Sequence, residues 1–317
     1  MTATLSPAKV VALGGGHGLA ASLAALRRVS SHVTAVVTVA DNGGSSGRLR
    51  QEFGVLPPGD LRQALAALCS DDEWGRTWAR VLQHRFASHG ALHQHAVGNL
   101  LIVALWELLG DHVDGLEWVA RLLGAEGRVL PMAAVPLDIV AEVAGLDAGD
   151  PEVVHRVVGQ VEVATTQGQV VHVSLEPARP QACEQAVRAV READVVVLGP
   201  GSWYTSIIPH LLVPELAEAL CSASASRILT LNLAAQPGET TGFSAGRHLD
   251  VLSQHAPGLR LDFVLADSSA SGERLGLARA AARMGAEVTY ADLAAEDTAR
   301  HDPGLLAHSY STLIGGG

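Results

Sequence analysis

The sequence contains almost no lysine. Of its 22 lysine and arginine residues, Lys9 is the single lysine and the rest are arginines. Lys9 precedes the first apolar run and follows no glycine loop, which excludes a Walker A phosphate loop, because that motif needs Gly-Lys-Ser or Gly-Lys-Thr. Pyridoxal-phosphate and other Schiff-base chemistry is excluded as well, since it needs a suitably placed lysine amine. Any phosphate group must instead be bound by arginines, hydroxyl groups and backbone N–H groups.

Cysteine and unbroken apolar runs are also scarce. Cys69, Cys183 and Cys221 have no CxxC or CxxH spacing, so we interpret them as reduced thiols of a cytoplasmic protein. The longest uncharged stretch, Val195–Pro214, is broken by glycines and prolines that a membrane helix tolerates poorly. Met1–Lys9 lacks the apolar core of a signal peptide. We therefore expect a soluble, cytoplasmic protein with no membrane insertion.

Positive charge is outweighed by negative charge. The 22 lysine and arginine residues face 33 aspartate and glutamate residues, which gives a net charge of -11. This sign is wrong for a protein that holds nucleic acid through its overall field, so we expect no nucleic-acid partner. An anionic ligand must be bound by a local pocket. Hydrophobic residues make up 48% of the chain, which is enough to bury a substantial core.

Short apolar runs rich in β-branched residues alternate with segments of helical periodicity. This alternation is typical of a doubly wound α/β fold, and we expect residues 1–317 to form a single domain around a mostly parallel, Rossmann-like sheet. In such folds the ligand binds at the carboxyl ends of the strands. The runs predict strands at Val10–Leu13, Thr34–Val39, Asp194–Leu198, Ile228–Leu231, Leu261–Leu265 and, more weakly, Val288–Tyr290. The periodic segments predict helices at Ala20–Arg28, Leu61–Leu68, Gln181–Glu192, Pro214–Cys221 and Glu273–Met284.

The middle of the chain, residues 74–175, departs from this alternation. Trp74–Leu123 is almost wholly helical in pattern, whereas Val129–Leu175 is rich in strand-forming residues. Within the second part, Val161–Thr165 and Val170–Leu175 flank a polar turn and predict a β-hairpin. We therefore expect a helical and β-hairpin insertion between two parts of one sheet.

A glycine-rich turn follows the first predicted strand and opens the first predicted helix. Its sequence is Gly14-Gly15-Gly16-His17-Gly18-Leu19. Free backbone N–H groups and the positive end of the helix dipole at such a turn favour a phosphate. The dinucleotide fingerprint is incomplete, because Leu19 stands where GxGxxG requires its third glycine. The alternative is a tight turn without a ligand, and we expect His17 to be a loop side chain or a substrate contact rather than a metal ligand.

A second candidate loop follows the second predicted strand. It reads Asp41-Asn42-Gly43-Gly44-Ser45-Ser46-Gly47-Arg48-Leu49-Arg50. Two hydroxyl groups, three glycines and two arginines after one carboxylate predict an oxyanion-binding loop, in which Asp41 faces a metal ion or a sugar hydroxyl. The alternative is a purely structural loop.

The segment Gly59-Asp60-Leu61-Arg62 adds one acid and one arginine to the candidates. Asp60 is suited to be the N-cap of the helix predicted at Leu61–Leu68, and capping alone would explain it. Arg62 lies in the first turn of that helix, where the helix dipole disfavours a cation. A bound anion nearby would remove this conflict.

Four histidines, His84, His89, His93 and His95, lie close together in the sequence. Their spacings of five, four and two residues fit no single helix face, and no cysteine or acid joins them. We interpret the segment as a solvated connection and expect no metal site there. His95 and Asn99 stand at the entrance of the next apolar helix, where both present polar groups.

Two further polar segments follow predicted strands. In Gly199-Pro200-Gly201-Ser202-Trp203-Tyr204, glycines let a ligand approach the backbone. Either Trp203 or Tyr204 is expected to stack on a base, and the alternative is that these aromatic side chains pack against the sheet edge. Asn232–Gly242, which includes Gln236, repeats the arrangement after the next strand. Four strand ends are therefore predicted to converge on one crevice.

The order of these segments resembles the bacterial gluconeogenesis factor family, which is similar in fold to 2-phospho-L-lactate transferase. The resemblance runs from about Val10 to Asp302 and rests on GGGHG, TVADNGGSSGRLR, GDLR, HAVGN, LGPGSWYTSIIPHLLVPE, NLAAQPGETTGF and the late Arg300-His301-Asp302. It implies a cytoplasmic regulatory protein that binds UDP-N-acetylglucosamine or UDP-glucose and requires no further cofactor. Such a protein supports cell-wall synthesis and cell shape on gluconeogenic carbon sources.

The resemblance also implies where the nucleotide sugar binds. The turn Gly14–Gly18, the loop Asp41–Asn42, Gly199–Ser202 and Arg300 are expected to line the site, with Arg300 as a bidentate clamp on the diphosphate. Because the fold relatives are commonly dimeric, we expect a homodimer, for which the apolar helices between Trp74 and Leu123 could supply the interface. The protein partner in cell-wall synthesis is unidentified.

Three functions are open at this point. The first is a UDP-sugar-binding regulator, and the second is a phosphoryl-type transferase in which Asp41 and Asp60 hold Mg²⁺. The third, a nicotinamide-dependent oxidoreductase, is disfavoured by the missing third glycine. The transferase branch has a shorter, more acidic loop at Asn42–Ser46, which disfavours the second. We assign no catalytic residue. The candidate binding residues are Gly14, Gly15, Gly16, His17, Gly18, Asp41, Asn42, Gly43, Ser45, Ser46, Arg48, Asp60, Arg62, Asn99, Gly199, Pro200, Gly201, Ser202, Tyr204, Gln236 and Arg300.

Overall fold

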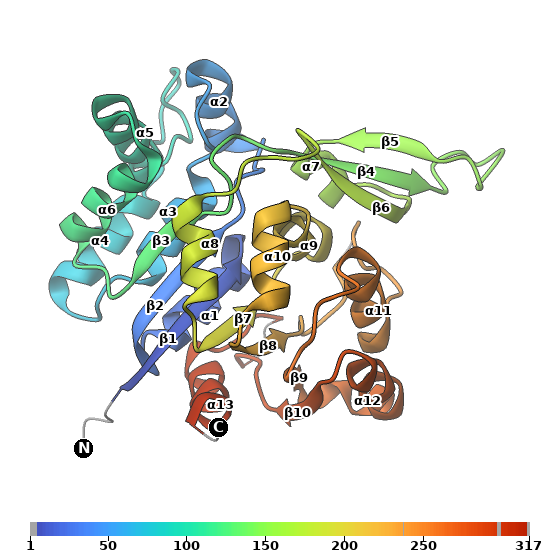
Figure 1. The fold of residues 1–317 in the computed structure, drawn as a ribbon. Helices are drawn as coiled ribbons and strands as arrows, with labels where there is room; N and C mark the ends of the chain where they lie inside the picture. Colours follow the sequence, from blue (N-terminus) through green and yellow to red (C-terminus); the bar gives the residue numbers. More distant parts are fainter. Residues whose placement is uncertain (1–4, 237, 297–298, 316–317) are drawn as a thin grey trace.

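Parallel strands form the centre of the computed structural model, which describes residues 5–236, 238–296 and 299–315 (Figure 1). Seven strands from these residues make one sheet in the order β10-β9-β8-β7-β1-β2-β3, and every neighbouring pair is parallel. The expected doubly wound, mostly parallel α/β fold is thereby confirmed. The strands are β1 (Ser6–Gly14), β2 (Ser30–Val37), β3 (Arg128–Pro131), β7 (Val195–Leu198), β8 (Ser226–Thr230), β9 (Phe263–Asp267) and β10 (Glu287–Ala291).

The central strands are apolar along most of their length. Val10, Val11, Ala12 and Leu13 of β1 are each at most 2% exposed, and all four residues of β7 are buried. A strand that helices cover on both faces needs such a continuous apolar run, in contrast to the alternating pattern of a strand with one solvated face. The core therefore extends on both sides of the sheet.

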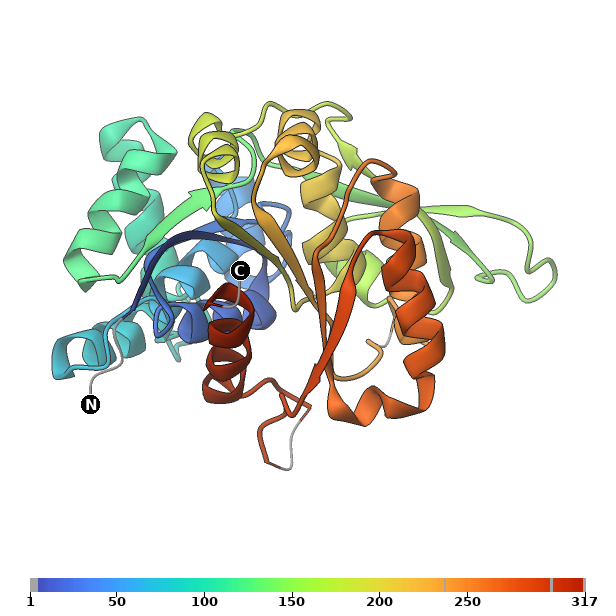
Figure 2. The same ribbon diagram turned by 60° about the horizontal axis from the view of Figure 1, so that its bottom comes forward.

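Helices cover both faces of this sheet (Figure 2). On one face α1 (Gly16–Leu26) packs against α3 (Gly59–Ala67) and α13 (Pro303–Gly315), and on the other α8 (Glu184–Arg191) packs against α10 (Pro214–Ser222). The helix α13 was not predicted. Its Tyr310 is fully buried, and the phenol group hydrogen-bonds Ser22 Oγ at 2.8 Å and Thr230 Oγ1 at 2.9 Å.

The remaining helices extend the structure beyond the sheet. Next to α3 and β3 lie α4 (Glu73–Gln83), α5 (Val97–Leu109) and α6 (His112–Leu123), so Trp74–Leu123 is helical as expected except for the connection at residues 84–96. None of the helices in the described ranges is long and apolar enough to cross a membrane. The others are α2 (Gly44–Phe53), α7 (Gln160–Ala164), α9 (Ile208–Leu211), α11 (Ala245–His255), α12 (Arg274–Arg283), the π-turn η1 (Trp203–Ile207) and the 3-10 turn η2 (Ser268–Glu273).

A second, smaller sheet extends away from the main one (Figure 1). It consists of β4 (Asp138–Ala144), β5 (His155–Val158) and β6 (Gln169–Glu176), in the antiparallel order β5-β4-β6. The strand β3 lies within residues 74–175 but pairs with β2 in the main sheet. The segment expected as an insertion therefore contributes one edge strand to the central sheet.

The hairpin expected between Val161–Thr165 and Val170–Leu175 is wrong in its first strand. Val161–Thr165 overlaps the short helix α7, closed by bonds from Val163 N to Gly159 O and from Thr165 N to Val161 O, and β6 pairs with β4 instead. The side chain of Asn42 accepts the N–H of Val161 at 3.0 Å and so caps the helix from a distant loop. This tertiary contact outweighs the β propensity of the valines.

The order in which the chain adds strands to the sheet reverses between β1 and β7. From β1 the chain proceeds outward through β2 to β3, and from β7 it proceeds the opposite way through β8 and β9 to β10. The helices α1 and α10, which follow these two adjacent strands, therefore lie on opposite faces of the sheet, and a crevice is expected at the carboxyl ends of β1 and β7. Ligands of doubly wound folds bind at such a switch point.

Candidate functional site

The loops that follow β1 and β7 lie against each other at the switch point. The helix α1 begins at Gly16, directly after β1, with Gly15 at the N-cap position. Gly16 has a φ of 59°, which side chains rarely adopt, and a Cβ on Gly18 would collide with the carbonyl group of Pro200. Glycine is thus required at Gly16 by conformation and at Gly18 by close approach. The turn brings the N-terminus of α1 onto the loop after β7.

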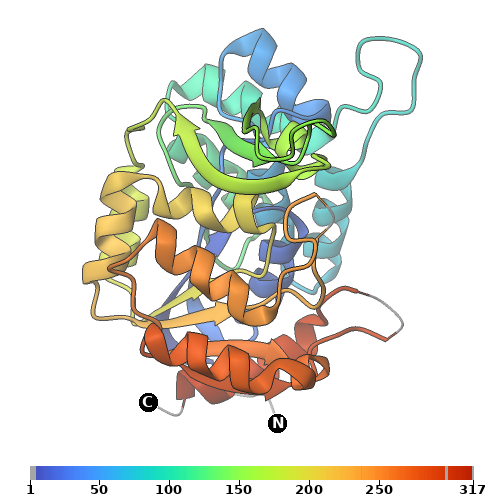
Figure 3. The same cartoon turned by 90° about the vertical axis from the view of Figure 1, so that its right-hand side faces the viewer.

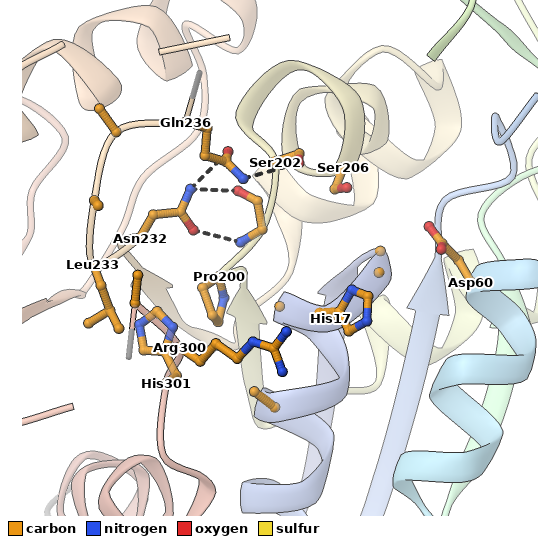
Figure 4. Close-up of a pocket in the computed structure, with 18 of the residues that line it drawn as sticks. His17, Asp60, Pro200, Ser202, Ser206, Asn232, Leu233, Gln236, Arg300 and His301 are labelled. Atoms are coloured by element: carbon orange, nitrogen blue, oxygen red, sulfur yellow. Dashed lines mark hydrogen bonds between the residues drawn. The ribbon is translucent and has the colours of Figure 1, made fainter. Parts of the chain in front are cut away.

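A pocket of about 540 Å³ lies at this junction (Figure 4). Its walls come from the glycine turn, the loops after β7 and β8, the segment before α13, and single residues of α3 and α7. The volume is within the usual range for a small-molecule site. The lining residues are Gly15, Gly16, His17, Gly18, Ala21, Asp60, Gln160, Pro200, Gly201, Ser202, Ser206, Asn232, Leu233, Ala234, Ala235, Gln236, Ala299, Arg300 and His301.

The candidates named from the sequence divide into two groups. Those that line the pocket are Gly15, Gly16, His17, Gly18, Asp60, Pro200, Gly201, Ser202, Gln236 and Arg300. Those that do not are Gly14, Asp41, Asn42, Gly43, Ser45, Ser46, Arg48, Arg62, Asn99, Gly199 and Tyr204. Pro237, in the predicted segment Asn232–Gly242, lies outside the described residues.

A network of amide groups fixes the wall after β8. The Asn232 side chain accepts the N–H of Gly201 and donates to the Gly201 carbonyl oxygen, both at 2.9 Å, and also donates to Gln236 Oε1 at 3.1 Å. Gln236 Nε2 donates to Ser202 Oγ at 3.2 Å. Asn232 was not among the candidates, and its position two residues beyond β8 was the available signal. Because both of its polar groups bind the backbone of Gly201, its role is to hold the two loops together.

Asp60 is the single acidic side chain among the lining residues of this pocket. It is 8% exposed and lies in the first turn of α3, where Pro58 and not Asp60 takes the N-cap position. Burial, followed by the negative charge of Asp41, raises the pKa of Asp60 to about 7, although a hydrogen bond from Gly16 N–H and the charge of Arg62 act in the opposite direction. The expectation that Asp60 caps its own helix is wrong, because its carboxylate turns instead to the start of α1.

Asp41 lies just outside the pocket wall. Its Oδ1 accepts the N–H of Gly43 at 2.8 Å, and its Oδ2 is 3.0 Å from the position that a Cβ on Gly59 would take. Two carboxyl groups are therefore close neighbours behind the glycine turn. Their mutual repulsion contributes to the raised pKa of Asp60.

Three of the candidates outside the pocket satisfy one another in the interior. Ser45 Oγ accepts from Asn99 Nδ2 at 3.0 Å and hydrogen-bonds His95 Nδ1 at 3.1 Å, and Asn99 Oδ1 accepts from Arg62 Nε at 2.8 Å. Arg62 also donates to the side chain of Gln83, and burial lowers its pKa to about 10. The cation in the first turn of α3 is thus met by amide oxygens, and the network ties α2, α3 and α5 together.

The rest of the Asp41–Arg50 loop also contacts protein. Asn42 Nδ2 donates to Glu162 Oε2 at 2.7 Å, and Arg48 donates to the carbonyl oxygens of Ala91 and His93. These bonds anchor the small sheet and the connection between α4 and α5, which protrudes from the body of the molecule (Figure 3). The loop that was predicted to bind an oxyanion therefore joins peripheral segments to the core.

Tyr204 takes the second of the two orientations that were open for it. The residue is 2% exposed, and its ring is edge-on to Phe243 with the centroids 6.4 Å apart. Its backbone N–H donates to Glu239 Oε2 at 2.8 Å, and Thr205 Oγ1 donates to the other oxygen of the same carboxylate at 2.7 Å. Tyr204 therefore packs in the interior and does not stack on a base in the pocket.

The segment between β10 and α13 folds back toward the pocket. Ala294 and His301 form a β-bridge, and Ala295 N donates to Arg300 O at 2.9 Å. The turn between them carries Arg300, and Figure 4 shows its side chain extending into the pocket toward His17 at the start of α1. A guanidinium group and a helix N-terminus thus face the same space.

No cluster of three or more His, Cys, Asp or Glu side chains suited to hold a metal ion occurs among the residues that the structure describes. His95 is buried against Ser45, whereas His84, His89 and His93 are exposed. The interpretation of this histidine-rich segment as a solvated connection agrees with that exposure.

The fold and the pocket together define a class. The molecule is a Rossmann-like α/β protein with a pocket at its topological switch point, lined by a glycine turn, a helix N-terminus, amide groups, one acid and one arginine. Comparison with known sequences and structures shows where in this class it belongs.

The family model described as 2-phospho-L-lactate transferase CofD matches residues 10–302. A gluconeogenesis factor relative from Mycobacterium leprae is 55% identical over 305 residues, covering 95% of this chain and 85% of the relative. The gluconeogenesis factor of Listeria monocytogenes is 36% identical over 312 residues, covering 95% and 92%. A crystal structure of a UPF0052 family member from Bacillus halodurans superimposes with a TM-score of 0.83 at 30% identity, covering 96% of this chain and 99% of the other. The chain belongs to the gluconeogenesis factor family, within the wider group that the CofD model describes.

Proposed function

We propose that this protein is a cytoplasmic UDP-sugar-binding regulator that supports cell-wall synthesis and cell shape on gluconeogenic carbon sources. Its ligand is UDP-N-acetylglucosamine or UDP-glucose, bound in the pocket at the switch point. Its output is a ligand-dependent surface for a protein partner in cell-wall synthesis. Membership of the gluconeogenesis factor family supports this proposal.

The observation that carries the proposal is that Arg300 and the N-terminus of α1 face the same space across the pocket (Figure 4). A guanidinium group can bind two phosphate oxygens at once. The free backbone N–H groups at the start of a helix also bind a phosphate, because the positive end of the helix dipole lies there. This combination suits a diphosphate in a protein with a single lysine. The amide groups of Asn232 and Gln236 belong to the wall of the same pocket, where they hold the loops after β7 and β8 together.

Calorimetric titration of the purified protein tests the proposal. UDP-N-acetylglucosamine and UDP-glucose are titrated with and without Mg²⁺, and GDP and NAD serve as controls. Saturable binding of a UDP-sugar without Mg²⁺, with the ligand recovered unchanged, supports the regulator. Metal-dependent binding of GDP without any binding of a UDP-sugar contradicts it.

The second candidate is a Mg²⁺-dependent phosphoryl-type transferase. The proximity of Asp41 to Asp60 favours it, because a divalent cation would relieve the repulsion that raises the pKa of Asp60. Two carboxylates are a sparse donor set for a resident metal, and Asp41 already accepts the N–H of Gly43. The ligand recovered after each titration distinguishes the two candidates. A titrated nucleotide or nucleotide sugar that is converted only when Mg²⁺ is present would favour the transferase over the regulator.

We further propose that the protein is a homodimer joined through the surface of α4 and α6. Trp74 and Trp118 are 55% and 53% exposed there, and Trp74 Nε1 donates to Leu122 O, which brings the two helices together at this surface. Exposed aromatic side chains in a group are typical of protein interfaces. Analytical ultracentrifugation of wild type and of a Trp74→Ser, Trp118→Ser double variant tests this interface. A dimeric wild type and a monomeric variant support it. A variant that stays dimeric contradicts it.

A further inference from the structure

The two ends of the pocket differ in charge. Arg300 projects into it from the segment before α13, whereas Asp60 enters from α3 on the other side of the glycine turn (Figure 4). Beside Asp60 lies the hydroxyl group of Ser206, which is 3.2 Å from the position that a Cβ on Gly15 would take. One end therefore suits an anion, and the other offers a carboxylate and a hydroxyl group.

The carboxylate of Asp60 already occupies part of the anion-binding start of α1. It accepts the N–H of Gly16, and its Oδ2 lies 2.6 Å from the position of a Cβ on Gly15. A phosphate placed at this end would meet a negative charge in a buried setting, where repulsion is stronger than in water. The diphosphate is thus displaced toward Gly18 and Arg300, and the Asp60 end is left for another part of the ligand.

We propose that Asp60 is a specificity-determining residue, which receives the hydroxyl or amide hydrogens of an uncharged sugar and rejects a sugar that carries a carboxylate. This inference rests on the proposed function, because it assumes a UDP-sugar in the pocket. The hexose lies at the Asp60 end beside Ser206 and Gln160, and the diphosphate lies between the glycine turn and Arg300. UDP-glucose and UDP-N-acetylglucosamine are accepted, whereas UDP-glucuronate is discriminated against.

The expected discrimination is large enough to measure. The Asp60 carboxylate makes charge-assisted hydrogen bonds when it accepts the hydroxyl hydrogens of a sugar. In a sugar acid a carboxylate replaces one of these hydroxyl groups, so that two negative charges face each other and neither has a hydrogen-bond donor. One such mismatch lowers affinity by roughly 10- to 100-fold. Asp60→Asn removes the negative charge and keeps an oxygen that can accept a hydrogen bond.

The test compares UDP, UDP-glucose and UDP-glucuronate by calorimetry at pH 8 in the presence of EDTA. At this pH the ionised form of Asp60 predominates, since its pKa is about 7. Wild type is expected to bind UDP-glucose at least about 10-fold more tightly than UDP-glucuronate. In Asp60→Asn this ratio falls to within a few-fold, whereas Asp147→Asn, which removes an exposed carboxylate from the loop between β4 and β5, keeps it.

Several results separate this inference from the proposed function. Equal affinity of wild type for UDP-glucose and UDP-glucuronate overturns the inference without the use of any variant and leaves UDP-sugar binding intact. Weakening of all three ligands by the same factor in Asp60→Asn, with a melting temperature no lower than that of wild type, also overturns it, because Asp60 would then act on the nucleotide. If wild type binds none of the three ligands, the proposed function is contradicted and the inference falls with it.

Discussion

The carboxylate of Asp60 lies against Gly15, with Oδ2 only 2.6 Å from the position where a Cβ of residue 15 would be. Asp60 belongs to α3, and Gly15 lies in the turn before α1. Any residue larger than glycine at position 15 would displace the Asp60 carboxylate. This packing buries Asp60 at the base of the pocket and raises its pKa to about 7. The same contact thus shapes the pocket and sets the charge at one end of it.

The raised pKa of Asp60 predicts that stability depends on pH. The pKa rises from an ordinary value of 3.8 to about 7 on folding, so the contribution of this group is fully present below about pH 4 and is lost as the pH rises toward 7. We expect Asp60→Asn to exceed wild type in free energy of unfolding by roughly 2 to 4 kcal/mol at pH 8, and by far less at pH 4. Urea denaturation at both pH values measures the difference. A difference that does not change with pH would contradict the assignment, and Asp147→Asn serves as the control.

The contact between Gly18 and Pro200 predicts a strong effect of a single methyl group. Gly18→Ala places a Cβ against the Pro200 carbonyl group, and the two loops must separate, at a cost of about 1 to 3 kcal/mol. Gly276→Ala is a matched control in α12, since a Cβ there meets nothing within 4 Å, and we expect it to be neutral or slightly stabilising. Thermal unfolding of both variants provides the measurement. Equal stability of the two variants would show that the loops are not in contact.

Arg300 is predicted to contribute to ligand affinity and not to the fold. We expect Arg300→Ala to weaken binding of UDP-N-acetylglucosamine by about 10- to 150-fold, because one charge-assisted contact is lost. The control is Arg279→Ala, which removes the same charge from an exposed position on α12. Calorimetric titration of both variants gives the comparison. Unchanged affinity in Arg300→Ala would remove Arg300 from the site.

The network around Asn99 is predicted to stabilise the fold. Asn99→Leu removes the acceptor of Arg62 Nε and the donor to Ser45 Oγ in a position that is 1% exposed. We expect a loss of roughly 2 to 4 kcal/mol in the free energy of unfolding, because a buried guanidinium group loses a partner. Gln254→Leu on the exposed side of α11 is expected to change it by less than about 0.5 kcal/mol. Similar values for the two variants in urea denaturation would contradict a structural role for Asn99.

The central sheet could be predicted from the sequence because its strands are buried on both faces. Val10–Leu13 and Val195–Leu198 are unbroken apolar runs, and each is followed directly by a glycine-rich turn, which favours a buried strand. The helix α7 (Gln160–Ala164) could not be predicted, since the N–H of Val161 in its first turn is bound by Asn42, which lies far away in the sequence. The local sequence pattern therefore predicts a strand that is buried on both faces, but it does not predict a helix whose first turn is bound by a side chain far away in the sequence.

The candidate site could be predicted in position but not in full composition. Polar segments after β1, β7 and β8 do meet at one pocket, since the carboxyl ends of parallel strands lie on one edge. Ser45 and Asn99 have the same chemistry as pocket residues, and only the fold shows that they satisfy each other. Asn232 lies in a segment that was predicted to reach the crevice, but its bonds to the backbone of Gly201, which make it a structural residue, are seen only in the fold.

The most direct test of this account is a crystal structure of the protein with UDP-glucose. The account predicts the diphosphate between the Arg300 guanidinium group and the N-terminus of α1, with the glucose hydroxyl groups within hydrogen-bonding distance of the Asp60 carboxylate. A nucleotide sugar bound elsewhere on the molecule, or bound in the pocket with its diphosphate at Asp60, would contradict it.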